Sequence, residues 1–250
     1  MKVRVTEDYE EMSDVAAELA LQQIREKPAS VLGLTAGSSP LGLYQRLQAA
    51  YREGTVDFSR VRIFTLSEYI GLEETDEQSF AYYTRKNFCE GLNLAEENIY
   101  MPNGMADDIA QECARYGKAI EAAGGIDMMI LGIGPNAHIG FNEPGPVFVP
   151  ETHVAELSEA TRAANARFFD NPADVPYWAV SMGMRDIMFA RHGRCAIEQL
   201  LALEVFLGDG VGRLALVPDI GHGHHVGLAD DANRLARQQF RVARTNAHAV

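Results

Sequence analysis

The 250-residue sequence lacks paired cysteines, long apolar runs and an excess of positive charge. Its three cysteines, Cys89, Cys113 and Cys195, are widely spaced and form no Cys-X-X-Cys pair, so neither a disulfide framework nor a zinc knuckle is indicated. No stretch approaches the roughly 18 consecutive apolar residues that a membrane-spanning helix needs. The start of the chain is acidic where a signal peptide would be apolar. We therefore expect a cytoplasmic protein without a membrane partner.

Positive charge is scarce throughout the chain. It carries 22 lysines and arginines against 35 aspartates and glutamates, a net charge of −13, and it has no lysine after Lys118. Binding to the phosphates of a nucleic acid needs a basic face, so this balance argues against a nucleic-acid partner. An anionic substrate would have to be captured by a local site, because the overall field does not attract it.

Short apolar runs alternate with longer segments of helical periodicity. The runs predict buried strands at 30–34, 61–66, 127–133, 177–182 and 214–217, and the periodic segments predict helices at 8–26, 41–53, 78–90 and 106–123. This alternation is typical of an α/β fold in which helices cover both faces of a mainly parallel sheet. The length is sufficient for a single domain, and we expect one over 1–250.

Three loops that follow predicted strands are rich in polar groups: 35–40, 67–72 and 134–144. Ligands of parallel α/β sheets bind beyond the carboxyl ends of the strands, where such loops converge. We therefore expect these loops to face one cleft.

The first loop contains Gly37, Ser38 and Ser39 and leads into a predicted helix through Pro40, a residue suited to a first helical turn. Free N–H groups and the positive dipole end of that helix could hold a phosphate, with the serine hydroxyls as further donors. The loop is not a Walker A motif, since no Gly-Lys-Ser/Thr follows. An ordinary serine-capped helix start is the structural alternative.

The third loop brings Asn136, His138, Asn142 and Glu143 together after the clearest buried strand. A histidine titrates near neutrality, and a carboxylate such as Glu143 could orient His138 or raise its pKa. A lone histidine is more often structural, but the polar residues around His138 at the end of a strand favour a role in proton transfer.

Several motifs together resemble the glucosamine-6-phosphate deaminase (isomerase) family. The segment GIGPNAHIGFNEPG is similar to the signature loop of that family, LTAGSSPLGLY to its phosphate loop and FTLSEYIGL to its second catalytic loop. The stretches PNGMADDIAQECARY and TRAANARFF follow in the same order as in the family. The resemblance extends from about residue 31 to 184, and it implies a Rossmann-like three-layer α/β sandwich.

The resemblance also implies residue roles. The turn Gly37–Ser39 and Arg167 would hold the phosphate of the sugar. His138 would open the pyranose ring by moving a proton between the ring oxygen and the anomeric hydroxyl, and Asn136 and Glu143 would orient it. The implied reaction converts glucosamine 6-phosphate to fructose 6-phosphate and ammonia, and it requires neither a metal nor a nucleotide cofactor.

The chain departs from the family pattern at two places. Family members usually carry Asp-Glu-Tyr where this chain has Ser67, Glu68 and Tyr69, and the resemblance implies that the aspartate moves the proton between C2 and C1. A serine hydroxyl cannot do so unaided, because its pKa lies far above neutrality. Glu68 is adjacent, but successive strand residues point to opposite faces. Residues 190–250 also match poorly and lack the lysine that serves the family as a phosphate ligand.

We therefore expect a weakened deaminase, and two alternatives stay open. A 6-phosphogluconolactonase-like hydrolase would tolerate Ser67, since it abstracts no proton from C2. A non-catalytic sugar-phosphate-binding protein would tolerate both departures. The histidine loop of the lactonases resembles GHTASLFP, whereas this chain reads AHIGFNEP, which favours the amino-sugar branch. A homo-oligomer is compatible with the sequence.

The cluster His222, His224 and His225 is a separate candidate for metal binding. Only His222 and His224 would share a face of an extended stretch, and no carboxylate stands at ligand spacing before Asp230. A solvated loop is the favoured interpretation, and no metal site is predicted.

Overall fold

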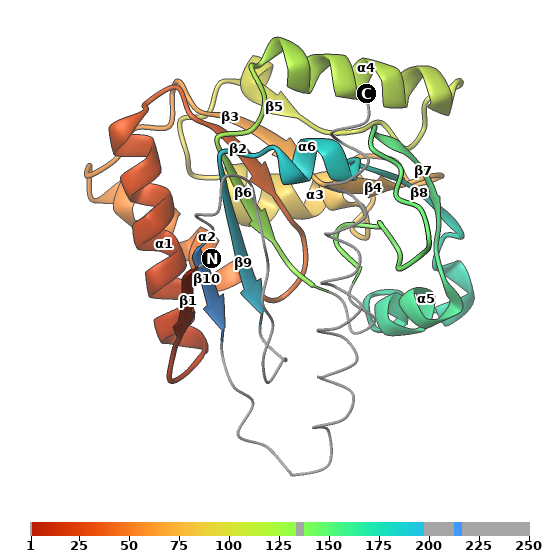
Figure 1. Ribbon diagram of the computed structural model, residues 1–250, viewed down its shortest axis with the longest axis horizontal. Helices are drawn as coiled ribbons and strands as arrows, with labels where there is room; N and C mark the ends of the chain where they lie inside the picture. Colours follow the sequence, from red (N-terminus) through yellow and green to blue (C-terminus); the bar gives the residue numbers. More distant parts are fainter. Residues whose placement is uncertain (1, 134–137, 198–212, 217–250) are drawn as a thin grey trace.

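The computed structural model describes residues 2–133, 138–197 and 213–216. A seven-stranded sheet lies at its centre, and every pair of neighbouring strands is parallel (Figure 1). The strands, in spatial order, are β1 (Lys2–Val5), β10 (Arg213–Leu216), β9 (His192–Ile197), β6 (Met128–Leu131), β2 (Val31–Leu34), β3 (Arg62–Thr65) and β5 (Ile99–Tyr100).

A smaller antiparallel sheet stands beside the large one. It consists of β4 (Ser67–Tyr69), β8 (Trp178–Ser181) and β7 (His153–Glu156), with β8 in the middle. Because β4 begins two residues after β3 ends, the chain passes directly from the large sheet into the small one. The predicted strand at 177–182 belongs to this small sheet.

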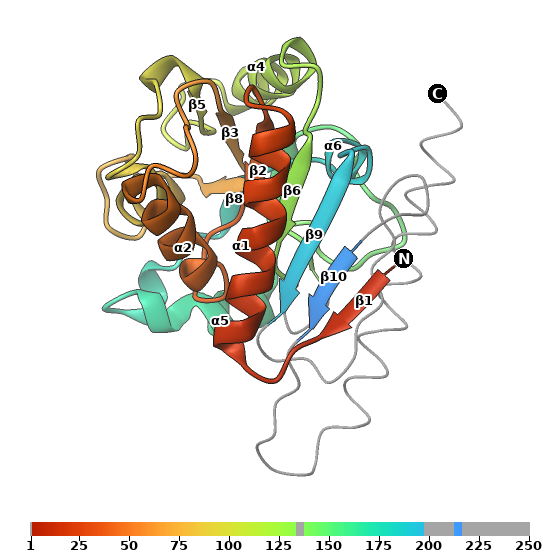
Figure 2. The ribbon, with the colours of Figure 1, turned by 90° about the vertical axis from the view of Figure 1, so that its left-hand side faces the viewer.

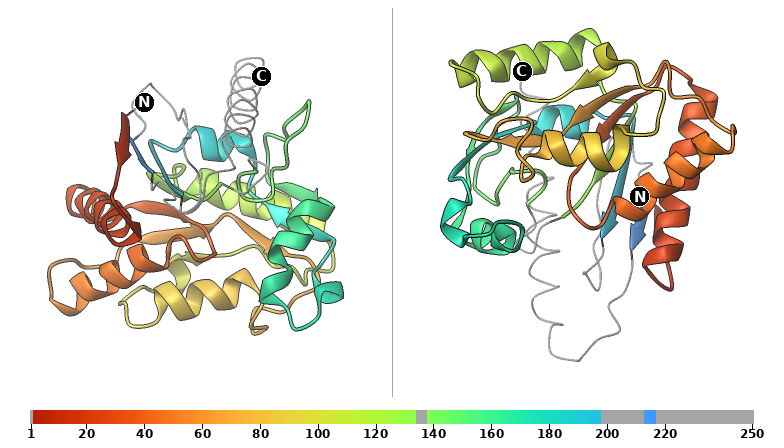
Figure 3. Two further views of the ribbon diagram at one scale, coloured as in Figure 1. Left: turned by 90° about the horizontal axis from the view of Figure 1, so that it is seen from below. Right: turned by 180° about the vertical axis from the view of Figure 1, so that it is seen from behind.

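Helices cover both faces of the large sheet, as Figures 2 and 3 show. On one face lie α1 (Tyr9–Glu26), α2 (Leu41–Arg52) and α3 (Phe80–Thr84), which continues as the π-helical turn η1 (Arg85–Cys89). On the other face lie α4 (Ile109–Ala122) and α6 (Met184–Met188). The remaining elements are α5 (Glu159–Asn165) and the short 3₁₀ turns η2 (Glu96–Asn98), η3 (Ala166–Phe168) and η4 (Pro172–Asp174).

Strand β6 shows why helices must cover both faces of the large sheet. Met128 and Ile130 pack with α1 and α2, whereas Met129 and Leu131 pack with α4 and α6, and all four side chains are buried. Alternate side chains of a strand point to opposite faces, so a strand that is apolar at every position requires a helical layer on each side. The predicted three-layer α/β fold is confirmed. None of the helices among the described residues is long and apolar enough to cross a membrane.

Gly183 joins β8 to α6 at a point where two backbone segments almost touch. A Cβ atom added to Gly183 would lie 2.1 Å from the carbonyl oxygen of Pro150 and 2.3 Å from that of Glu151. The N–H of Arg185 donates to this Pro150 oxygen at 3.0 Å. The segment before β7 is therefore held against the start of α6 by backbone contacts that only glycine permits.

We predict that Gly183→Ala destabilises the protein by at least about 2 kcal/mol, because the added methyl must displace backbone rather than a mobile side chain. Gly117→Ala is the matched control: Gly117 lies in α4 with no atom within 4 Å of its added Cβ. That substitution should stabilise the helix by about 0.5–1 kcal/mol. Urea unfolding measures both, and equal effects of the two variants would contradict the close approach at Gly183.

Candidate functional site

The three polar loops leave one edge of the large sheet. Strand β2 pairs in parallel with β3 on one side and with β6 on the other, in the registers Leu34 with Thr65 and Gly33 with Met129. The carboxyl ends of the three strands therefore lie side by side. The loop 35–40 and the loop that contains His138 start from adjacent strands at the same edge, as the sequence predicts (Figure 1). The first part of 67–72 instead forms β4 of the small sheet.

The buried Tyr44 and the partly buried Tyr83 hold the backbone of the loop 35–40. The hydroxyl of Tyr44 donates to the carbonyl oxygen of Thr35 at 2.6 Å, and the hydroxyl of Tyr83 donates to that of Gly37. Burial raises the pKa of both phenols well above the ordinary value, so both stay neutral donors. Gly37 has a φ of +116°, a conformation that favours glycine. The sequence pattern around Gly37 did not reveal that Tyr44 and Tyr83 hold this loop.

The start of α2 differs from the sequence prediction in one respect. Its first N–H groups were expected to be free for a phosphate, but the N–H of Leu41 donates to Ser38 O at 3.2 Å and the N–H of Gly42 donates to the Tyr9 hydroxyl at 2.8 Å. The same hydroxyl donates to Ser38 O at 3.0 Å. The turn before α2 and the Tyr9 phenol of α1 therefore already accept some of the N–H groups that were expected to bind a phosphate.

The loop after His138 is fastened to the small sheet by Asn142 and Ser181. The buried Asn142 amide donates to the carbonyl oxygens of Ile139 and Met182, at 2.9 Å each, and the N–H of Phe141 donates to Ser181 Oγ at 3.1 Å. Asn142 was a candidate for the site, but these contacts give it a structural role. They fix the backbone between His138 and Glu143.

Ser67 lies next to this anchor. It is the first residue of β4, it pairs with Ser181 across the small sheet, and only 6% of its surface is exposed. The side chain of Leu66, one residue earlier, lies 3.7 Å from where a Cβ on Gly140 would be. The structure thus brings Ser67 into the neighbourhood of the histidine loop.

Glu68 points into a different environment. Its carboxylate accepts the N–H groups of Tyr69 at 2.8 Å, Phe80 at 3.0 Å and Ala81 at 2.7 Å, which ties β4 to the first turn of α3. Burial of the side chain outweighs these three donors and raises its pKa from an ordinary 4.5 to about 7. The Glu68 carboxylate is therefore engaged by the backbone at the start of α3.

His138 and Glu143 both lie against Thr161 of α5, and Glu143 also contacts Ser158, the N-cap residue of that helix. The Thr161 hydroxyl donates to Glu143 Oε1 and lies 3.3 Å from His138 Nδ1. The Ser158 hydroxyl donates to the same Oε1 at 3.0 Å and accepts the N–H of Thr161 at 3.1 Å as the N-cap of the helix. Sequence reasoning placed the histidine beside a carboxylate but missed the two hydroxyls, because an N-cap motif looks the same whether or not a site lies against it.

Burial lowers the pKa of His138 below its ordinary value, although the Glu143 carboxylate acts in the opposite direction. Of the two effects that the sequence left open for Glu143, orienting His138 or raising its pKa, a net rise in the pKa is not found, because desolvation of the cation outweighs the attraction of the carboxylate. A lowered pKa favours the uncharged imidazole, the form that is able to accept a proton.

The other predicted site residues are less closely connected. Arg167 lies in η3, directly after α5, with an exposed side chain whose guanidinium is 4.7 Å from the ring centre of Phe168. Asn136 and the cluster His222, His224 and His225 lie outside the described residues. Among the residues that are described, no group of three or more His, Cys, Asp or Glu side chains is placed to hold a metal ion.

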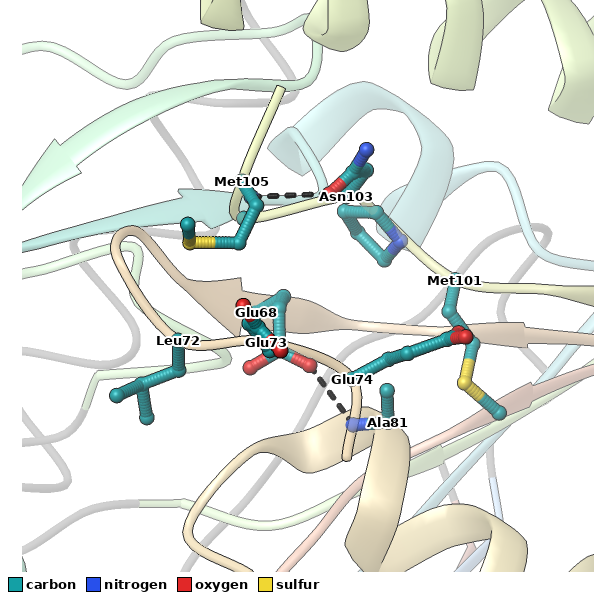
Figure 4. Close-up of a pocket in the computed structure, with 10 residues that line it drawn as sticks. Glu68, Leu72, Glu73, Glu74, Ala81, Met101, Asn103 and Met105 are labelled. Atoms are coloured by element: carbon teal, nitrogen blue, oxygen red, sulfur yellow. Dashed lines mark hydrogen bonds between the residues drawn. The ribbon is translucent and has the colours of Figure 1, made fainter. Parts of the chain in front are cut away.

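A cavity of about 450 Å³ has Glu68 among its lining residues. Figure 4 shows Glu68 on its wall together with Glu73, Glu74 and the methionines Met101 and Met105. Of the predicted catalytic and phosphate-binding residues that the structure describes, none lines this cavity. It is therefore distinct from the edge of the sheet where His138 lies.

Comparison with known proteins gives consistent matches. The family model described as glucosamine-6-phosphate isomerases/6-phosphogluconolactonase matches residues 6–189. A glucosamine-6-phosphate deaminase of Thermoanaerobacter sp. is 50% identical over 191 residues, which are 76% of this chain and 76% of that protein. The corresponding enzyme of Clostridioides difficile is 51% identical over 188 residues, 75% of this chain and 76% of the relative.

Solved structures show the same likeness. A monomeric glucosamine-6-phosphate deaminase superimposes with a TM-score of 0.81 at 32% identity, covering 94% of this chain and 100% of the other. The 6-phosphogluconolactonase from Trypanosoma brucei has a TM-score of 0.68 at 15% identity, covering 86% and 95% of the two chains. At that identity the second match shows a shared fold alone.

The raised pKa of Glu68 predicts a pH-dependent contribution to stability. A carboxyl that holds its proton more tightly when folded stabilises the fold fully below pH 4.5, and this contribution is lost as the pH rises through about 7. The loss amounts to at most about 3 kcal/mol. Glu68→Gln mimics the protonated form and does not titrate, so its cost in free energy of unfolding should be smaller at pH 7.5 than at pH 5. Urea unfolding at both values tests this, and a cost that stays constant with pH would contradict it.

Proposed function

The chain belongs to the family of glucosamine-6-phosphate isomerases and 6-phosphogluconolactonases, and we propose that it is a glucosamine-6-phosphate deaminase of weakened activity. The reaction consumes one water and converts glucosamine 6-phosphate to fructose 6-phosphate and ammonia. The observation that carries the proposal is the linked set His138, Thr161 and Glu143 at the edge of the sheet. The deaminases at about 50% identity support this substrate for the chain.

Ring opening is the step that His138 would perform. Its neutral imidazole would take the proton of the anomeric hydroxyl and return it to the ring oxygen, which frees the aldehyde. The Glu143 carboxylate would stabilise the imidazolium that exists between the two transfers. Because burial lowers the pKa of His138, the histidine would be in the proton-accepting form at neutral pH. Asn136 would assist in orienting the ring.

The sugar phosphate would lie at the end of β2. Tyrosine hydroxyls hold the backbone carbonyl groups of Thr35, Gly37 and Ser38, which supports a preformed anion site at the turn Gly37–Ser39. Arg167 would close that site with a guanidinium suited to phosphate geometry. We propose that the enzyme acts in the cytoplasm and uses neither a metal nor a nucleotide.

Ser67 is the weak point of this site. The isomerisation moves a proton from C2 to C1, and a neutral hydroxyl is a poor base even for a C–H bond next to the freed aldehyde. Glu68 is engaged by three backbone N–H groups and faces α3. A lactonase-like hydrolase would avoid this step, but the lactonase structures share only the fold with this chain. The amino-sugar reaction therefore remains the favoured one.

The central test is to incubate the purified protein with glucosamine 6-phosphate and to measure ammonia and fructose 6-phosphate. We expect slow but measurable turnover that His138→Ala abolishes, because that substitution removes the proton carrier of ring opening. His153→Ala is the control: His153 lies in β7, where its ring contacts the Glu151 carbonyl oxygen at 2.9 Å, and its loss should leave turnover near the parent level. Equal activity of His138→Ala and the parent would reduce His138 to a structural residue.

A second prediction concerns the missing base. Ser67→Asp should raise turnover by at least about 10-fold, the low side of what a general base contributes. Ser67→Asn has the same size and polarity as the aspartate variant but no basic group, so it should stay at the parent level. Brisk turnover by the parent itself, or an equal gain in both variants, would show that another group serves as the base.

A further inference from the structure

The hydroxyl of Thr161 stands between the histidine and the carboxylate of the proposed site. It lies 3.3 Å from His138 Nδ1 and donates to Glu143 Oε1. Thr161 is 2% exposed, so solvent does not compete for these contacts. We propose that Thr161 is a positioning residue: its hydroxyl links the Glu143 carboxylate to His138 Nδ1 by hydrogen bonds, and this link sets the tautomer of the imidazole. This inference deepens the proposed function and rests on it for the step that the histidine performs.

The direction of the two hydrogen bonds follows from counting protons. A hydroxyl has one proton to donate, and a carboxylate oxygen only accepts. The proton of Thr161 therefore goes to Glu143, and the contact with His138 Nδ1 requires the histidine to donate. A neutral imidazole has a single N–H, so that proton resides on Nδ1. The lone pair of the ring then resides on Nε2, the atom that can receive a proton from a substrate hydroxyl.

The surroundings hold Thr161 in this orientation. Its backbone N–H donates to Ser158 Oγ at 3.1 Å, and its hydroxyl lies 3.0 Å from the same atom. Ser158 also donates to Glu143 Oε1 at 3.0 Å. The first turn of α5 thus presents two hydroxyls to one carboxylate oxygen, but only the Thr161 hydroxyl is also placed at the histidine. This difference separates the role of Thr161 from that of an ordinary helix cap.

The chain offers a matched pair of substitutions. Thr161→Val keeps the branched shape and the backbone N–H but removes the hydroxyl, whereas Thr161→Ser keeps the hydroxyl. Thr152→Val is the same chemical change at another buried threonine, whose Oγ1 has no partner among the described residues. A general effect of removing a buried hydroxyl would appear at both positions, and the loss of the relay would appear only at Thr161.

The first measurement reads the tautomer directly and needs no activity. Protein labelled with ¹⁵N-histidine is studied by long-range ¹H–¹⁵N correlation at a pH where His138 is neutral, and His138→Gln identifies its signals. The parent and Thr152→Val should carry the proton on Nδ1, and so should Thr161→Ser. In Thr161→Val the population should shift toward Nε2–H. A parent that carries the proton on Nε2, or a Thr161→Val variant that keeps it on Nδ1, would overturn the proposal.

The second measurement is kinetic and uses the parent or Ser67→Asp, whichever turns over faster. Thr161→Val should lower kcat by about 10–100-fold, the range known for outer-shell groups that orient a metal-ligating histidine, with KM nearly unchanged. Thr161→Ser should restore most of the rate. A rise in KM alone, or no rescue by serine, would count against positioning. If no form turns over glucosamine 6-phosphate, the proposed function fails, while the tautomer measurement still decides the role of Thr161.

Discussion

Parallel pairing of β3, β2 and β6 is the constraint on which the candidate site depends. Parallel neighbours end at the same edge of a sheet, so the loops that follow them must emerge together. Two buried layers, one against α1 and α2 and the other against α4 and α6, stabilise this arrangement because both faces of each strand are apolar. The polar residues of the loops therefore lie at the same end of the sheet, although they are far apart in the sequence.

Side-chain hydrogen bonds hold the backbone of both loops at this edge. Tyr44 and Tyr83 hold the backbone of the first loop, and Asn142 with Ser181 holds that of the histidine loop. Each of these side chains is buried or nearly so, and a buried polar group without a partner would be costly. The same contacts that satisfy these groups therefore also fix the positions of the proposed binding and catalytic residues.

The site is uneven in its chemistry. On the ring-opening side, His138, Thr161 and Glu143 form a continuous chain of donors and acceptors. On the side where a proton must leave carbon, Ser67 offers a hydroxyl in a buried position, and the neighbouring carboxylate of Glu68 is turned into the start of α3. The lack of a base at position 67 would therefore slow the isomerisation, which needs a base, more than the ring opening, which needs the histidine.

The sequence by itself determined the fold class, the strands β2, β3 and β6, the helices α1, α2 and α4, and the composition of the three loops. These elements are readable because apolar periodicity and glycine-rich turns are local signals. It did not reveal the strands β1, β4, β5, β7 and β9, or the tyrosines and hydroxyls that hold the site. Residues such as Tyr83 and Thr161 carry no pattern of their own, and their partners lie 46 and 18 residues away. The lowered pKa of His138 was likewise decided only by the tertiary structure, because burial is a property of the packed chain and here it outweighs the carboxylate that the sequence places nearby.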